Sequence, residues 1–220
     1  MSKNKLARFA ENETFPNLFQ HPHYNVHVEE FPLKGKWRTD YFKNSNPLVI
    51  EVGCGRGEYT LAMASRFPEC NFVGIDRKGA RLWRGCKSAL EMKLDNVAFL
   101  RIGIDTIPFY FGNNEVDEIW VTFPDPQPKK ERRRLVSPVF IERYKQIMKP
   151  GGVLHLKTDS RELYRYTLET AEKYKWNVHE NREDIYLDGE IPLLTEIQTF
   201  YEKMWLKEGR TISYVKLEFH

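Results

Sequence analysis

The sequence predicts an α/β fold with a doubly wound, mostly parallel sheet, and three observations support this class. Short apolar segments alternate along the chain with segments whose apolar residues recur at helical spacing. The first apolar segment ends in glycines at alternate positions, Gly53, Gly55 and Gly57. The 220 residues are 41% hydrophobic and 30% charged, which suits one globular domain with a full core. Strands that alternate with helices form parallel sheets covered on both faces.

The predicted elements follow this alternation in order. β-rich apolar runs predict buried strands at 47–52, 71–76, 96–102, 115–123 and 153–158. Helical spacing predicts helices over 59–67, 78–92, 136–149 and 160–174. Pro138 lies in the first turn of the third helix, Pro150–Gly152 end it, and Ser160 is the N-cap of the fourth. Late strands are expected at 176–181 and 210–219, one of them antiparallel. Polar, turn-rich residues 1–46 are predicted to be an N-terminal arm packed on residues 47–220, with a helix possible near Asp40.

Bulk composition restricts the environment and the kinds of site. The cysteines Cys54, Cys70 and Cys86 show no CxxC spacing, which argues against a disulfide framework or a zinc site and favours a reducing cytoplasm. The N-terminus lacks an apolar signal segment, and no apolar run approaches membrane-spanning length. We therefore expect a cytoplasmic protein, monomeric or homodimeric, without a membrane or metal partner. His21, His23 and His27 are irregularly spaced in the arm and are expected at the surface.

The glycine-rich turn after the first strand points to a cationic ligand. Its spacing is GxGxG, whereas dinucleotide-binding proteins carry GxGxxG. Glu51 ends the buried strand before it, where a carboxylate without a partner would be costly. A pyrophosphate would be repelled by Glu51, whereas the ammonium and sulfonium of S-adenosylmethionine would be attracted. The weaker alternative is a glycine turn without a ligand.

Two further strand ends provide candidate cofactor contacts. Asp76 ends the second strand about twenty residues after the glycines, where a carboxylate can accept hydrogen bonds from both ribose hydroxyls. The third strand ends at Ile102-Gly103-Ile104-Asp105. Gly103 could allow backbone contact with an adenine, and Asp105 could supply an acid there or cap a following helix, the cap being favoured.

The most specific stretch follows the fourth strand. Pro124, Pro126 and Pro128 exclude helix and fix an extended path around Asp125. In doubly wound sheets the ligand binds beyond the carboxyl ends of the strands, so this path lies at the ligand edge. A carboxylate held rigidly there is preorganised for catalysis. A proline-rich surface loop would not explain that position.

Basic residues gather in three groups after strand ends. They are the run Lys129, Lys130, Arg132, Arg133 and Arg134; the helix start with Arg77, Lys78, Arg81 and Arg84; and Lys157, Arg161 and Arg165. All three groups are expected to face one sheet edge. With a net charge of only +3, this is a local patch, which favours nucleic acid over a solvated charge run.

These features resemble the bacterial tRNA (guanine-N7)-methyltransferase family. The match runs from about Pro47 to the C-terminus, and its most specific segment is FPDPQPKKERRRLVSPVF, beside VIEVGCGRGEYTLAMA, NFVGID, GGVLHLKTDSREL and TEIQTFYEKMW. The resemblance implies a Rossmann-like class I S-adenosylmethionine-dependent methyltransferase. Its substrate would be tRNA, methylated at N7 of guanine 46 in the variable loop.

The resemblance also implies roles for individual residues. Asp125 is the expected catalytic residue. Expected cofactor contacts are Glu51, Gly53, Gly55, Asp76, Arg77, Gly103, Ile104 and Asp125. Expected tRNA contacts are Lys129, Asp159, Thr195, Glu196 and Gln198, the last three in a late segment that is commonly TKFE or TEYE in the family.

Guanine N7 carries a free lone pair, so methyl transfer needs alignment more than a general base. Asp125 is expected to orient the guanine by accepting hydrogen bonds from its N1–H and exocyclic amine. Phe123, Tyr201 and Trp205 could stack on the base, although core packing is the stronger expectation. Three alternatives stay open: a methyltransferase of a small molecule or protein, a catalytically silent RNA-binding relative, and, least favoured, a nicotinamide dehydrogenase.

Overall fold

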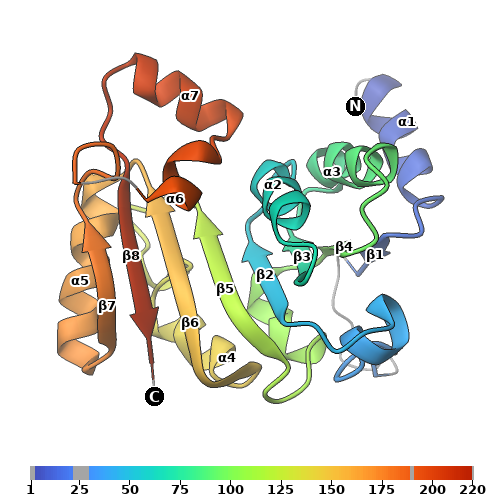
Figure 1. The fold of residues 1–220 in the computed structure, drawn as a ribbon, viewed down its shortest axis with the longest axis horizontal. Helices are drawn as coiled ribbons and strands as arrows, with labels where there is room; N and C mark the ends of the chain where they lie inside the picture. The colour runs from blue at the N-terminus through green and yellow to red at the C-terminus, as the bar shows by residue number, and fades with distance from the viewer. Residues whose placement is uncertain (1–2, 22–29, 189–190, 220) are drawn as a thin grey trace.

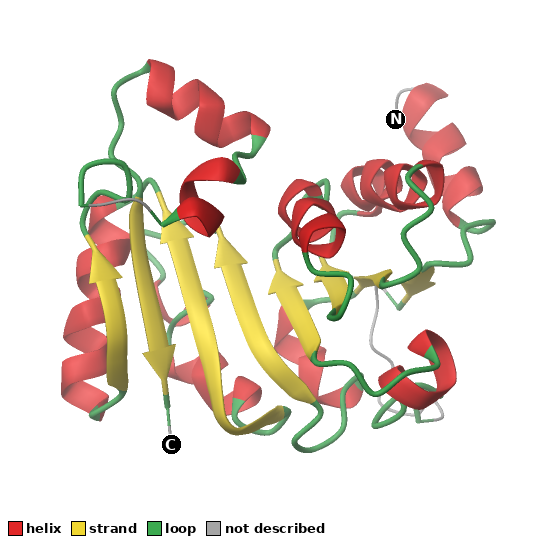
Figure 2. Cartoon of the chain, in the orientation of Figure 1, coloured by secondary structure: helices red, strands yellow, loops and turns green. Residues whose placement is uncertain are grey.

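The computed structural model describes residues 3–21, 30–188 and 191–219, which form an eight-stranded sheet covered on both faces (Figures 1 and 2). The strand order is β1-β4-β3-β2-β5-β6-β8-β7. All neighbours pair in parallel except β8, which is antiparallel to both β6 and β7. The strands are β1 (Leu18–Gln20), β2 (Leu48–Val52), β3 (Asn71–Ile75), β4 (Val97–Arg101), β5 (Val116–Thr122), β6 (Met148–Thr158), β7 (Asn177–Arg182) and β8 (Ser213–Glu218). The predicted doubly wound sheet with a late antiparallel strand is confirmed.

Helices cover both faces of the sheet (Figure 1). They are α1 (Lys3–Asn12), α2 (Glu58–Arg66), α3 (Gly79–Glu91), α4 (Pro138–Tyr144), α5 (Arg161–Tyr174), α6 (Pro192–Glu196) and α7 (Phe200–Lys207). Helix α1 packs on α3, and α7 lies above the carboxyl ends of the strands. One apolar cluster joins α4 and α5 to the sheet, and a second joins α2, α3 and α6 to its opposite face. Fully buried strands β2 and β3 separate these two clusters, as expected for parallel strands.

The chain folds differently from the prediction between α4 and β6. Helix α4 ends at Tyr144, and strand β6 already begins at Met148, so Pro150–Gly152 lie inside the strand. The carbonyl of Ile147 accepts hydrogen bonds from the backbone N–H groups of Glu115 and Val116 at 2.8 and 2.9 Å. These long-range bonds draw residues 145–149 away from the helix, which helical spacing alone could not reveal.

Residues before the first predicted strand add to both the sheet and the core. Strand β1 pairs in parallel with β4 at the sheet edge. A π-helical turn, Trp37–Phe42, lies near the predicted helix at Asp40 and buries Trp37 fully against Phe111. The division of the chain at residue 46 stays a prediction.

Candidate functional site

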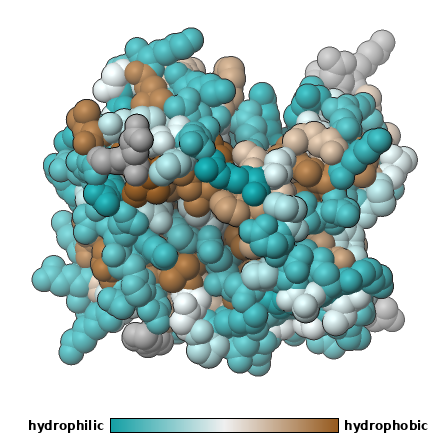
Figure 3. All heavy atoms as spheres, viewed as in Figure 1, coloured by the Kyte–Doolittle hydropathy of each residue, from teal (hydrophilic) through white to brown (hydrophobic). Residues whose placement is uncertain are grey.

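A cavity of about 970 Å³ opens at the carboxyl ends of β2, β5 and β6. Strands β2 and β5 are the neighbours at which the strand order reverses, which is where doubly wound sheets bind ligands. Helices α1 and α3 border the cavity on one side and α7 borders it on the other (Figure 1), and the space-filling view is hollowed between these two sides (Figure 3). Of the predicted site residues, five line this cavity: Glu51, Gly53, Gly55, Asp125 and Asp159.

The glycine turn has a backbone that only glycine adopts readily. Gly53, Gly55 and Gly57 have φ values of +81°, +59° and +70°, in the left-handed region. A Cβ on Gly57 would lie 2.6 Å from the ring of Phe99, so side chains are excluded there by packing as well. The turn therefore brings bare backbone to the cavity and starts α2 directly behind it.

Glu51 faces the cavity from the end of β2 while remaining 5% exposed. Its carboxylate accepts hydrogen bonds from the hydroxyls of Thr60 and Thr122 and, at 2.9 Å, from the Thr60 backbone N–H. Burial raises the pKa of this carboxyl, and those hydrogen bonds oppose the shift. A cation bound in the cavity would favour the ionised form of Glu51 further.

Asp76 braces the glycine turn and does not itself line the cavity. One oxygen accepts the Gly55 N–H at 3.0 Å, and the other accepts the Lys78 N–H at 2.7 Å. Arg77 beside it is exposed. Each oxygen of a carboxylate has two lone pairs, so Asp76 keeps capacity for further donors at the cavity edge.

Gly103 and Ile104 also do not line the cavity. Gly103 is the N-cap of a 3-10 helix, Ile104–Phe109, so Asp105 lies within the first turn and the prediction that it caps the helix is wrong. A Cβ on Gly103 would come within 2.6 Å of Asp105 Oδ1. The Asp105 carboxylate therefore occupies the space that a side chain at position 103 would fill.

Asp125 projects from a rigid turn into the cavity. Its Oδ1 accepts the backbone N–H of Gln127 at 3.0 Å, and the next carbonyl, that of Pro126, accepts Arg134 Nε at 2.9 Å. Arg134 is 2% exposed, pairs with Glu162 and lies over the ring of Tyr166. The turn is therefore held by the buried guanidinium of Arg134 as well as by its prolines.

The basic groups are therefore only partly gathered at one edge. The prediction is wrong for Arg134, which is buried, and for Lys157, which is 0% exposed. Lys129, Lys130, Arg132 and Arg133 are exposed but lie outside the cavity, whereas Lys78, Arg81 and Arg84 line it.

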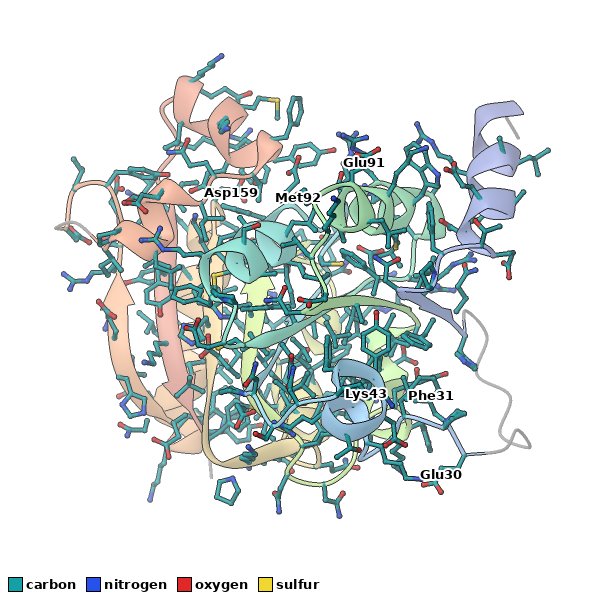
Figure 4. All side chains as sticks on the ribbon, turned by 45° about the vertical axis from the view of Figure 1, so that its right-hand side comes forward. Glu30, Phe31, Lys43, Glu91, Met92 and Asp159 are labelled. Carbon is teal, nitrogen blue, oxygen red and sulfur yellow. The ribbon has the colours of Figure 1, made fainter. Side chains whose placement is uncertain are left out.

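Asp159 follows β6, and Figure 4 shows it at the upper edge of the sheet beneath α7. Its Oδ2 accepts from Arg210 at 3.1 Å, and both side chains line the cavity. The neighbouring Ser160 caps α5 by accepting the Leu163 N–H, as predicted. Asp159 is thus held in place while remaining accessible.

The predicted contacts Thr195, Glu196 and Gln198 do not line the cavity. Thr195 binds the Ile191 carbonyl, Glu196 pairs with Arg66, and Gln198 donates to the Tyr186 hydroxyl at 3.0 Å. The residues that reach the cavity come next in the chain: Thr199, Phe200 and Tyr201.

Sequence reasoning missed this segment although a signal for it was present. Thr199-Phe200-Tyr201-Glu202 has the order Thr, any residue, aromatic, Glu, the same order as TKFE and TEYE. Thr199 and Glu202 form a capping box that starts α7. Phe200 and Tyr201 are 58% and 44% exposed, so core packing, which was expected for Tyr201, is not its role. Tyr201 stacks on Trp205 at 5.8 Å.

The described residues contain no group of three or more His, Cys, Asp or Glu side chains that could hold a metal. His21 is half-buried near Phe31 and Tyr110, and burial lowers its pKa, whereas His23 and His27 lie outside the described residues. Within the same ranges, every helix is too short or too polar to cross a bilayer.

Comparison with known proteins identifies the family. A family model described as "Putative methyltransferase" matches residues 45–215. A tRNA (guanine-N(7)-)-methyltransferase of Christiangramia forsetii is 48% identical over 99% of this chain and 98% of that protein. The chain belongs to the tRNA (guanine-N(7)-)-methyltransferase family. A Porphyromonas gingivalis member of this tRNA (guanine-N(7)-)-methyltransferase family is 48% identical over 92% of this chain and 84% of its own length.

Solved structures of more distant proteins share the fold of this tRNA (guanine-N(7)-)-methyltransferase family member. The 16S rRNA methyltransferase KamB superposes with a TM-score of 0.63 at 15% identity, covering 83% of this chain and 90% of that one. A SAM-dependent methyltransferase from Aquifex aeolicus superposes with a TM-score of 0.55 at 17% identity, covering 84% and 94%. The fold is thus that of class I S-adenosylmethionine-dependent methyltransferases.

Proposed function

We propose that this protein transfers a methyl group from S-adenosylmethionine to N7 of a guanine in tRNA, guanine 46 of the variable loop, in the cytoplasm. One observation carries the proposal: the Asp125 carboxylate and the glycine turn at Gly53 and Gly55 line the same cavity. The names of the curated relatives support tRNA and guanine N7 as substrate and position.

The residues beside the glycine turn fit S-adenosylmethionine, which supplies an electrophilic methyl group on a sulfonium when bound. Glu51 would accept the ammonium, because a buried carboxylate with a raised pKa gains most from a cation. Asp76 would use its remaining lone pairs for the ribose hydroxyls, with Arg77 beside it. The Asp105 carboxylate, which occupies the space that a side chain at position 103 would fill, would supply the acid near the adenine. Gly103 and Ile104 would contact the base with their backbone and apolar side chain.

Asp125 would orient the guanine. Its carboxylate can accept from both the N1–H and the exocyclic amine of the base, since each oxygen has two lone pairs and the Gln127 N–H uses only one of those on Oδ1. N7 needs no deprotonation, so rate acceleration comes from in-line alignment of N7 with the methyl carbon. A carboxylate near the ring also stabilises the positive charge that methylation creates.

Residues around this position would bind the rest of the nucleotide. Asp159 lines the cavity and would read the guanine or its ribose, and exposed Lys129 would contact a phosphate. For the late segment, we infer that Thr199, Phe200 and Tyr201 make the contacts, because they reach the cavity and Thr195, Glu196 and Gln198 do not.

The test is methylation of unfractionated bacterial tRNA with labelled S-adenosylmethionine, followed by mass spectrometry of the modified nucleotide. We expect 7-methylguanosine at position 46 with the wild-type protein. Asp125→Ala should lose nearly all activity even at saturating cofactor, because it removes the acceptor for the guanine as well as a predicted cofactor contact. Full activity of Asp125→Ala would reject its catalytic role. Methylation of free nucleosides but not of tRNA would favour a small-molecule substrate, and cofactor affinity without methyl transfer would favour a silent relative.

A further inference from the structure

One wall of the cavity is strongly cationic. It is formed by Arg8 of α1, Arg56 of the glycine turn, and Lys78, Arg81 and Arg84 at the start of α3, and we call these five residues the cationic wall. All five are exposed. None of them belongs to an ion pair within residues 3–21, 30–188 and 191–219. Five positive charges without an ion-pair partner in these ranges therefore line one cavity, whose lining also includes the carboxylates of Glu51, Glu58, Asp125 and Asp159.

The cationic wall has the dimensions of a contact for an extended anion. Arg81 and Arg84 are three residues apart on α3, Lys78 is the residue just before its first turn, and all three side chains line the cavity. Six residues of helix extend about 9 Å. A single carboxylate cannot contact all of that length, whereas a phosphodiester chain can.

Helix α1 joins the wall through a specific anchor on α3. The Glu11 carboxylate accepts Trp83 Nε1 at 2.6 Å and Lys87 Nζ at 2.8 Å. One turn earlier in α1, the guanidinium of Arg8 lies 4.7 Å from the centre of the Trp83 ring, which itself lines the cavity. Trp83 is thereby held by a hydrogen bond at its edge and a cation over its face.

A second bond fixes the end of the same helix. Asn12 is 1% exposed, and its Nδ2 donates to the carbonyl of Gly79 at 3.0 Å. A carboxylate and an amide at consecutive positions of α1 therefore bind two turns of α3. This arrangement determines where Arg8 points, because the side chains at 8 and 11 lie on the same side of a helix.

We propose that α1 is an RNA-binding element, which Glu11 docks on α3 so that Arg8 completes a cationic wall for the tRNA phosphate backbone beside the methylated guanosine. The inference rests on the proposed function, since it takes the same tRNA as the anion. Each phosphate contact made by the wall releases bound counterions, so affinity depends on salt. The aromatic side chains of α7 border the opposite side of the cavity, where a base and not a phosphate would be bound.

The first test measures tRNA affinity against salt concentration with the full chain. The slope of log K against log salt is negative, and its magnitude should decrease by about 2 to 3 in the combined variant Arg8→Ala, Arg81→Ala, Arg84→Ala. Each lost contact removes roughly 0.7 to 0.9 of that magnitude. The control is Lys173→Gln with Lys175→Gln, at the far end of α5, roughly 20 Å along that helix from the cavity residue Ser160. An unchanged slope in the triple variant overturns the proposal.

The second test asks whether removing the Glu11 carboxylate, which docks α1, strengthens or weakens tRNA binding. Glu11→Gln and Glu13→Gln each remove one negative charge, and the Glu13 carboxylate accepts from Gln20 of β1. Electrostatics alone predicts that both variants bind tRNA more tightly. If Glu11 docks α1, Glu11→Gln should bind tRNA more weakly. The magnitude of its salt slope should decrease by roughly 0.7 to 0.9, because the Arg8 contact is lost. Equal or tighter binding by Glu11→Gln, at unchanged thermal stability, overturns the role of α1.

Failure of this inference is distinct from failure of the proposed function. Wild-type protein that does not methylate tRNA sinks the proposed function whatever the variants do. Wild-type methylation with unaltered affinity in the triple variant sinks the cationic wall alone. Calorimetry with S-adenosylmethionine completes the test, because a loss of cofactor affinity with an unchanged tRNA salt slope would assign the wall to the cofactor and overturn the proposal.

Discussion

Inside the protein, the ammonium of Lys157 lies 2.7 Å from Oε1 and 2.9 Å from Oε2 of Glu202, and both side chains are 0% exposed. The same ammonium donates to the carbonyls of Leu194 and Ile197 at 2.6 and 3.0 Å. One charge at the end of β6 therefore fixes the chain before α7 and the first turn of α7 itself. This bond network positions Phe200 and Tyr201 over the cavity.

Removing one member of the Lys157–Glu202 pair should lower the free energy of unfolding much more than removing both members. Lys157→Met leaves the Glu202 carboxylate buried without its cation, which typically costs about 3–5 kcal/mol. Lys157→Met with Glu202→Leu should be less destabilised than the single variant, because no uncompensated charge remains. Chemical denaturation measures both free energies of unfolding. Equal destabilisation of the two variants would show that the pair does not act as a unit.

Arg134 should affect catalysis although it does not reach the cavity. Arg134→Lys keeps the charge but cannot bind the Pro126 carbonyl and Glu162 together in the same planar geometry. We expect kcat/KM for tRNA to fall roughly tenfold or more, since a catalytic group misplaced by about 1 Å can cost a hundredfold. The control Arg133→Lys changes an exposed neighbour and should leave kcat/KM within twofold. Similar values for both variants would contradict the bracing role.

Tyr201 should contribute through its ring and not its hydroxyl. Stacking of a base on an aromatic side chain contributes about 1–3 kcal/mol. Tyr201→Ala should therefore raise the tRNA KM by roughly five- to a hundredfold, whereas Tyr201→Phe should stay close to wild type. Steady-state kinetics at saturating cofactor measure both. A Tyr201→Phe variant as impaired as Tyr201→Ala would assign the effect to the hydroxyl.

Stability should decrease below neutral pH because of His155. Its ring stacks on Trp120 at 4.2 Å, its Nδ1 is 2.7 Å from the Tyr214 hydroxyl, and burial lowers its pKa from 6.5 to about 3 despite Glu118 nearby. The unfolded chain then binds more protons than the folded one between pH 3 and 6.5, so stability is complete above pH 6.5 and is lost as pH falls. At pH 5 the loss is about 2 kcal/mol.

His155→Gln provides the comparison for this pH dependence. Glutamine can still bond the Tyr214 hydroxyl but does not titrate. Denaturation curves between pH 5 and 7.5 should therefore show a shallower loss for the variant than for the wild type. Parallel curves would mean that other groups carry the pH dependence.

Much of the fold and part of the site could be predicted from local sequence. The alternation of strands and helices, the glycines with positive φ, Glu51 at a buried strand end, and Asp125 between prolines are all encoded within short segments, because backbone geometry and strand position depend on neighbouring residues. These features sufficed for the sheet, the edge that carries the cavity and the family.

Only the tertiary structure decided what the basic residues do. Lys157, Arg134 and Arg84 look alike in sequence, yet the first anchors α7, the second braces the Asp125 turn, and the third faces the cavity. Lys157 and Arg134 are paired with carboxylates far along the chain, Glu202 at 45 residues and Glu162 at 28 residues. A charged side chain is buried or solvated according to whether a distant carboxylate or carbonyl reaches it, and no local pattern contains that information.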